Sequence, residues 1–297
     1  LSEDESKLDV VSGLNLKSSS LPELRRIFTQ TINKGIHGLC FSPYVEGQGA
    51  GDILTEEQIR RRIDIIQPYT SSIRSFSCTE GNEMIPSIAR EKGLKTMVGA
   101  WISNDKRRNE QEINELVKLA EEGLVDIATI GNEVLLRKEL SAVEIIAYLK
   151  EARSRIPDHI PIGYVDAYYQ FLEVPGLANH CDVILINCYP FWEGADENYA
   201  LAYLDQMYNL VQGAAQGKEV IITETGWPSQ GQSVQAAQPN EYNAIKYFLN
   251  VQHWAKEKQV ACYYFSSFDE SWKVVQEGEV GTRWGLWDKN ERSKYSS

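Results

Sequence analysis

Cysteine and histidine are both scarce in this chain of 297 residues, and neither occurs at the spacing of a metal site. The five cysteines include no C-x-x-C pair, and their number is odd. We therefore expect free thiols in the core, because a disulfide framework or a redox motif would show regular spacing. The four histidines are scattered along the chain, so we expect no metal ion and no cofactor.

Long apolar runs and an excess of positive charge are also missing. No stretch approaches the roughly 18 consecutive apolar residues that a membrane-spanning helix needs. The 30 basic side chains are outnumbered by 42 acidic ones, which gives a net charge of −12. Such a protein repels phosphate backbones and anionic membranes, so nucleic acid is excluded as a partner. We expect a monomer with no membrane span.

The composition is that of one large folded domain. Hydrophobic residues make up 42% of the chain and charged residues 24%, which is enough for a sizeable core. The first 20 residues are polar and rich in serine, and we expect them to form a flexible tail. A helix start follows, with Ser20 as the N-cap and Pro22 just inside the helix. Residues 21–297 are then predicted to form a single catalytic domain.

Short apolar runs alternate with amphipathic stretches from residue 37 onward, which is the pattern of repeated βα units. Several of the runs are apolar at consecutive positions, as strands covered on both faces must be. Eight such units predict a (β/α)8 barrel of the α/β class. The alternative is an open doubly wound sheet, which would need a glycine-rich phosphate loop after its first strand, and the sequence Phe-Ser-Pro-Tyr stands there instead. The predicted strands are 37–42, 72–77, 95–102, 125–132, 161–165, 182–189, 219–223 and 260–267.

Three helix starts are marked by a capping residue with Glu or Gln three positions later. Thr55, Asn109 and Ser141 are the predicted N-caps of the helices after the first, third and fourth strands.

Two strands end in an isolated glutamate. The fourth ends Ile-Gly-Asn-Glu-Val, with Asn132 and Glu133, and the seventh ends Ile-Thr-Glu-Thr-Gly-Trp-Pro, with Glu224. In a barrel the active site lies at these strand ends, so both carboxyls face one mouth. A single glutamate there is compatible with an ordinary helix-start carboxylate. A pair matches the two carboxyls of glycoside hydrolysis, one protonated to assist the leaving oxygen and one ionised to attack the sugar.

These two motifs, Gly-Asn-Glu at 131–133 and Glu-Thr-Gly-Trp-Pro-Ser at 224–229, resemble the signatures of glycoside hydrolase family 17. The resemblance extends over most of the predicted barrel and implies that Glu133 is the acid/base and Glu224 the nucleophile of a retaining enzyme. It also implies that Glu270 and Lys273, three residues apart after the last strand, flank the nucleophile by hydrogen bonds. Their alternative interpretation is a surface ion pair.

Other polar residues at strand ends have plausible roles. Asn132 is expected to bond the 2-hydroxyl of the sugar, and Tyr189 to bond the nucleophile. Arg74 at the end of the second strand is a candidate for sugar binding or, alternatively, a structural ion-pair partner. Asn187, at the end of the sixth strand, is a further candidate, as is Glu80 beyond the second strand.

Aromatic side chains suggest a sugar-binding groove, because their flat faces match pyranose rings. Packing at the barrel ends is the alternative for each one. Two long loops, 225–238 and 269–287, are predicted to wall the cleft. The aromatic residues that we predict to bind substrate are Tyr44, Trp101, Tyr164, Phe191, Trp192, Trp227, Trp272 and Trp284.

The family resemblance implies hydrolysis of β-1,3-glucan of the laminarin type, without a cofactor. Two alternatives remain at this point: a β-1,3-glucanosyltransferase on the same scaffold, and a non-catalytic barrel that binds glucan. Because a polysaccharide cannot cross a membrane intact, we expect a secreted, periplasmic or cell-surface location.

Overall fold

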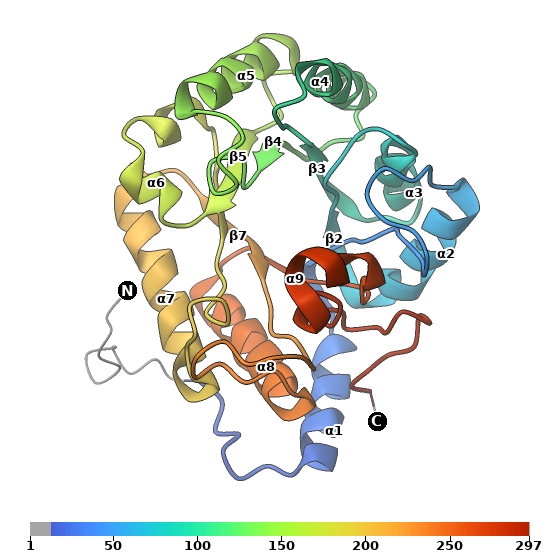
Figure 1. The fold of residues 1–297 in the computed structure, drawn as a ribbon, viewed down its shortest axis with the longest axis vertical. Coiled ribbons are helices and arrows are strands. Elements are labelled where there is room, and N and C mark those ends of the chain that lie inside the picture. The colour runs from blue at the N-terminus through green and yellow to red at the C-terminus, as the bar shows by residue number, and fades with distance from the viewer. Residues whose placement is uncertain (1–12, 297) are drawn as a thin grey trace.

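Parallel strands close into a barrel in this protein, whose computed structural model describes residues 13–296. Each strand pairs with the next along the chain, and β8 returns to β1 with Tyr263 opposite Gly38. Figure 1 shows the barrel surrounded by helices. The predicted (β/α)8 barrel is therefore confirmed and the open sheet is excluded. The strands are β1 (Ile36–Cys40), β2 (Thr70–Arg74), β3 (Lys95–Ala100), β4 (Ile127–Asn132), β5 (Ile162–Ala167), β6 (Ile184–Asn187), β7 (Val220–Thr225) and β8 (Cys262–Tyr264).

The helices form an outer layer, and α1 packs beside α8, which lies far from it in the sequence (Figure 1). Phe28 of α1 and Phe248 of α8 have ring centroids 4.8 Å apart, so this contact is part of the core. The connection from β5 to β6 holds only a single-turn α-helix and a short 3-10 helix. The α-helices are α1 (Leu21–Ile32), α2 (Glu56–Ile66), α3 (Ile85–Glu91), α4 (Lys106–Glu121), α5 (Ala142–Arg155), α6 (Gln170–Glu173), α7 (Glu197–Ala214), α8 (Glu241–Lys258) and α9 (Val274–Gly281), and the 3-10 helices are η2 (Gln67–Tyr69), η3 (Asn82–Met84), η4 (Leu177–His180) and η5 (Ser271–Lys273).

Three of the four predicted helix starts are confirmed. Ser20 caps α1, and Thr55 and Ser141 form complete capping boxes at α2 and α5. The prediction for Asn109 is wrong, because α4 begins at Lys106 with Asp105 as its N-cap. The side chain of Asn109 is buried one turn inside the helix, where it donates to the carbonyl oxygen of Ser103 and accepts from its amide.

The segment before α1 is packed on α8 over residues 13–20, so this part of the predicted flexible tail is held in place. The amide of Leu14 donates to Asn250 Oδ1 at 2.9 Å, the side chain of Leu16 is buried, and the Tyr242 hydroxyl donates to the carbonyl of Ser19 at 3.1 Å. The rest of the predicted tail, residues 1–12, lies outside the described residues.

The core occupies the barrel interior and the layer between the strands and helices. All five cysteines are buried and free, as predicted. Between residues 13 and 296, no helix has both the length and the apolar character needed to cross a membrane.

Strand pairing becomes irregular at the C-terminal ends of the strands that carry the two glutamates. The β6–β7 register shifts after Ile186, so that Asn187 pairs with Glu224, and the β4–β5 register shifts before Asn132. Such irregularities re-aim side chains. Directly after β4, Glu133 adopts a left-handed backbone with φ of 53°, which is uncommon for a residue with a side chain. Local backbone geometry thus turns these side chains toward the barrel mouth.

Candidate active site

A cleft of 1270 Å³ opens at the end of the barrel where the strands terminate. This volume is larger than a typical small-ligand pocket and suits a chain of several sugar rings. Twelve of the predicted site residues line it: Tyr44, Trp101, Asn132, Glu133, Asn187, Tyr189, Trp192, Glu224, Glu270, Trp272, Lys273 and Trp284.

Glu224 lies at the floor of the cleft with both carboxylate oxygens bonded. Its Oε1 accepts from Arg74 Nη1 at 2.5 Å, and its Oε2 accepts from the Tyr189 hydroxyl at 2.6 Å. Burial and the nearby charge of Glu224 raise the pKa of Tyr189 well above its usual value, so the phenol keeps the proton that it donates. A cation and a neutral donor on one carboxylate favour its ionised form. The predicted bond between Tyr189 and Glu224 is thus present.

Arg74 is a structural ion-pair partner of Glu224, which was the alternative to sugar binding for this residue. Its side chain is completely buried below the cleft and does not line it. Nη2 donates to Asn132 Oδ1 at 2.7 Å, and the guanidinium lies 4.3 Å from the centre of the Phe76 ring. Arg74 therefore fixes Asn132 and Glu224 relative to each other.

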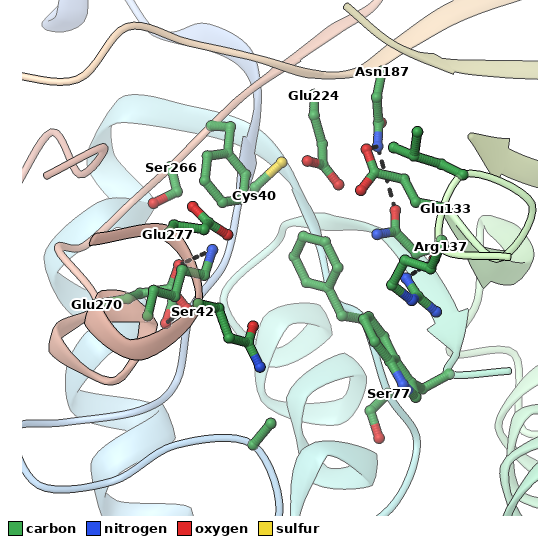
Figure 2. Close-up of a pocket in the computed structure, with 18 of the residues that line it drawn as sticks. Cys40, Ser42, Ser77, Glu133, Arg137, Asn187, Glu224, Ser266, Glu270 and Glu277 are labelled. Atoms are coloured by element: carbon green, nitrogen blue, oxygen red, sulfur yellow. Dashed lines mark hydrogen bonds and ion pairs between the residues drawn. The ribbon is translucent and has the colours of Figure 1, made fainter. Parts of the chain in front are cut away.

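Glu133 projects into the cleft opposite Glu224, and Figure 2 shows the two carboxyls pointing toward one another. Asn187 Nδ2 donates to Glu133 Oε1 at 2.9 Å. The Thr223 hydroxyl donates to Asn187 Oδ1 at 2.7 Å, which requires the amide nitrogen to face Glu133. Neighbouring strand ends thus orient the second carboxyl.

The two glutamates have different electrostatic surroundings. Burial raises the pKa of Glu133, the charge of Glu224 raises it further, and the bond from Asn187 lowers it, which leaves it at about 7. A carboxyl of this kind is about half protonated at neutral pH, so it can give a proton to a leaving group. Glu224 is instead held by the cation of Arg74 and the phenol of Tyr189.

Aromatic side chains form separate parts of the cleft wall. Tyr44 and Trp272 meet with ring centroids 5.9 Å apart, and Trp192 lies 5.6 Å from Trp284. Trp192 is 42% exposed, so much of its ring is available to a ligand.

Three predicted sugar-binding aromatics, Tyr164, Phe191 and Trp227, lie outside the cleft lining, and all are buried. Trp227 is 1% exposed, and its indole donates to the carbonyl of Gln238. Phe191 packs between Trp227 and Trp284, and the Tyr164 hydroxyl accepts from the amide of Leu135. The prediction is wrong for these three, because they pack beneath or behind the cleft wall.

Glu270 and Lys273 line the cleft, but their polar contacts differ from the predicted ones. They form an ion pair at 2.8 Å, and Glu270 also accepts from the Ser42 hydroxyl and from the indole of Trp272. The carboxylate of Glu224 is bonded by Arg74 and Tyr189 instead. Burial lowers the pKa of Lys273, but the charges of Glu270 and Glu277 outweigh this effect and raise it.

One of the two predicted wall loops lines the cleft. Loop 269–287, with η5 and α9, contributes Glu270, Trp272 and Trp284. Loop 225–238 contributes no lining residue and instead contacts the segment before α7, where the amide of Ala236 donates to the carbonyl of Gly194. Glu80 is also outside the lining and is paired with Arg108 at 2.8 Å.

Arg137 and Glu277 are among several charged residues of the cleft that were missed from the sequence. Arg137, in the turn after Glu133, donates to the carbonyl of Asn132, and its guanidinium lies 4.6 Å from the centre of the Trp101 ring. Glu277 reaches the cleft from α9, close to Lys273. Their spacing in the sequence could have indicated them, because Arg137 follows Glu133 by four positions and Glu277 follows Lys273 by four.

Residues 38–285 match the family model described as the BtgE/BtgC glycoside hydrolase domain. The chain belongs to this family. Because the match covers most of the chain and includes every strand except the first residues of β1, the barrel as a whole is the family's domain. The predicted resemblance to glycoside hydrolase family 17 is confirmed.

Relatives of known name support this assignment. A glucan 1,3-beta-glucosidase from Arthroderma benhamiae is 25% identical over 268 residues, which cover 83% of this chain and 86% of that protein. A probable beta-glucosidase, btgE, from Neosartorya fischeri is 26% identical over 86% of this chain, which spans only 46% of that longer protein. The solved structure of a family 17 beta-1,3-glucanosyltransferase from Rhizomucor miehei is 27% identical with a TM-score of 0.79, and the match covers 91% of this chain and 98% of that one.

Proposed function

We propose that this glycoside hydrolase cleaves β-1,3-glucan with retention of anomeric configuration. The observation that carries the proposal is the pair of carboxyls in one cleft, with Glu133 in surroundings that favour its protonated form and Glu224 bonded as an anion. The names of the relatives support the linkage, since one is a glucan 1,3-beta-glucosidase. An active-site mutant of the Rhizomucor miehei enzyme has been solved in complex with laminaritriose.

The mechanism follows from these assignments. Glu224 attacks the anomeric carbon while Glu133 transfers its proton to the glycosidic oxygen, so that the leaving sugar departs neutral and a glycosyl ester forms on Glu224. Glu133, now ionised, takes a proton from water as the water attacks the same carbon. The ester bond breaks, Glu224 is released as the carboxylate, and Glu133 is protonated again. Asn132, held by Arg74, is placed to bond the 2-hydroxyl during both steps.

Transfer to a second sugar is the alternative that a specific observation favours. The Rhizomucor miehei relative is named a beta-1,3-glucanosyltransferase. In that reaction a sugar hydroxyl replaces water in the second step, and all residue assignments stay the same. A non-catalytic glucan-binding barrel would not need two carboxyls with different surroundings.

Incubation with laminarin, followed by separation of the products, tests the proposal. Shorter oligosaccharides indicate hydrolysis, products longer than the starting chain indicate transfer, and unchanged glucan refutes both. Glu133→Gln and Glu224→Gln should each remove the activity. Glu110→Gln, on an exposed position of α4, is the control and should keep it. A polymeric substrate also leads us to propose that the protein works outside the cytoplasm.

A further inference from the structure

Asp166, at the end of β5, is a buried carboxylate that the mechanism above does not use. Its side chain is 0% exposed and does not line the cleft. Four groups donate to it: the Tyr164 hydroxyl, the amide of Ala167 at 2.7 Å, and the amides of Leu135 and Leu136 at 3.1 and 3.4 Å. Burial raises the pKa of Asp166, and these four bonds oppose the increase. Because every partner donates, the arrangement suits an ionised carboxylate.

The amides of residues 135 and 136 belong to the turn that carries Glu133. Glu133 itself is tied to β5 through its amide, which donates to the carbonyl of Val165 at 2.8 Å. The Tyr164 hydroxyl accepts from the amide of Leu135 at 2.9 Å while donating to Asp166. This turn starts from the left-handed backbone of Glu133, which is a strained conformation that persists only where surrounding contacts enforce it. Asp166 and Tyr164 supply those contacts.

We propose that Asp166 is a positioning residue for the acid/base: it holds the turn that aims Glu133 at the cleft and adds a second negative charge behind it. The inference rests on the proposed function, in which Glu133 is the proton donor. A charge of the same sign nearby disfavours ionisation of Glu133 and so keeps it in the form that can donate. Asp166 therefore affects both the position and the protonation of the acid/base without touching the substrate.

The charges around Glu133 agree with this role. Burial raises its pKa most, the negative charges of Glu224 and Asp166 add to the increase, and Arg137 opposes it. The charged and titratable groups that face Glu133 are Glu224 from β7, Asp166 and Tyr169 from β5 and the segment after it, Arg137 from its own turn, and Tyr189 after β6.

Asp166→Asn removes the charge and keeps the size of the side chain. We expect the pKa of Glu133 to fall, so that the alkaline limb of the pH profile moves to lower pH. The asparagine also carries an NH2 group in place of one carboxylate oxygen. This group cannot accept a hydrogen bond, so either the contact with Ala167 or the contact with the turn is lost. Tyr164→Phe removes a bond to the turn but leaves the charge in place.

The test compares two substrates across the pH range. One is laminaritriose, whose sugar leaving group needs a proton, and the other is a dinitrophenyl β-laminaribioside, whose leaving group does not. The kcat/KM of each reports the step that forms the glycosyl-enzyme. For Asp166→Asn at pH 7, we expect a loss on laminaritriose at least about tenfold greater than on the aryl glycoside, because general acid catalysis contributes roughly 100-fold or more. Tyr164→Phe should show the same preference without moving the alkaline limb.

Asp205→Asn is the matched control. Asp205 is also a buried carboxylate and accepts from the Trp254 indole at 2.7 Å, but it lies on α7 and outside the cleft. Any effect of this variant should be equal for both substrates. The inference would be overturned if Asp166→Asn lowered kcat/KM equally for both substrates and left the alkaline limb of the pH profile unmoved. If Asp166→Asn does not fold, equal losses of kcat/KM on the two substrates for Tyr164→Phe would overturn it. Glu133→Gln separates the two proposals: if it also affects both substrates equally, the assignment of Glu133 as the acid has failed.

Discussion

The guanidinium of Arg74 joins two residues that flank the reaction centre. One terminal nitrogen lies 2.5 Å from Glu224 Oε1 and the other 2.7 Å from Asn132 Oδ1. The arginine is fully buried and planar, so both contacts share one fixed geometry. The nucleophile and the residue expected to bond the 2-hydroxyl therefore cannot move independently.

Arg74→Met should destabilise the fold and abolish turnover. The substitution leaves Glu224 buried without its cation, and breaking a buried pair typically costs about 3–5 kcal/mol. Urea denaturation at pH 7 measures this loss. Arg60→Met is the control, because Arg60 pairs with Glu56 and Glu91 on the surface. Exposed pairs contribute less than about 1 kcal/mol, and a loss for Arg74→Met no larger than the control would show that the buried pair contributes little.

Glu224→Gln should stop catalysis while binding continues. The amide keeps the shape of the side chain but cannot attack the anomeric carbon. We expect no turnover of laminaritriose and a dissociation constant, from calorimetric titration, within a few-fold of that for the wild type. Loss of binding with retained turnover would refute the assignment of Glu224 as nucleophile.

Glu133→Gln should stabilise the protein at alkaline pH. The folded-state pKa of Glu133 is raised from 4.5 to about 7. The stability due to this raised value is therefore fully present below pH 4.5 and is lost as the pH rises through 7. At about 1.4 kcal/mol per pKa unit, the variant should exceed the wild type by up to roughly 3 kcal/mol at pH 8 and match it near pH 4. Thermal unfolding at both pH values measures the difference, and a constant offset would contradict the raised pKa.

Two tryptophans should respond in opposite ways to replacement by alanine. Trp192 is 42% exposed in the cleft, so Trp192→Ala should weaken binding of longer oligosaccharides and change stability little. Trp227 is 1% exposed and buried against Phe191, so Trp227→Ala should cost about 3–5 kcal/mol of stability. Binding and unfolding measurements on both variants check this. If Trp227→Ala weakened binding without destabilising the protein, Trp227 would be a substrate-binding residue as first predicted.

The fold and the two central glutamates could be predicted because they depend on local patterns. Apolar runs separated by amphipathic stretches specify strands and helices in a fixed order, and barrel strands bring their C-terminal ends to one mouth. Glu133 and Glu224 close such runs, so their meeting in one cleft follows from topology alone.

The errors concern side-chain direction and contacts between distant segments. Tyr164 lies inside β5 and Phe191 lies beyond the end of β6, and the sequence does not show which face of the wall a ring takes at either place. Asn109 satisfies the pattern of an N-cap, but Asp105, four residues earlier, accepts from the first amides of the helix. Arg137 lies on a turn and Glu277 on the short helix α9. The placement of both segments at the cleft depends on packing that local sequence does not determine.

The anomeric configuration of the first product tests the central claim most directly. If Glu224 forms a glycosyl ester that Glu133 then helps water to break, two inversions occur at one carbon. Proton NMR during the first minutes of laminarioligosaccharide cleavage should show the β-anomer at the new reducing end, and the α-anomer should grow only as the sugar mutarotates. If the α-anomer appears first, a single displacement operates and the paired roles of Glu133 and Glu224 are wrong.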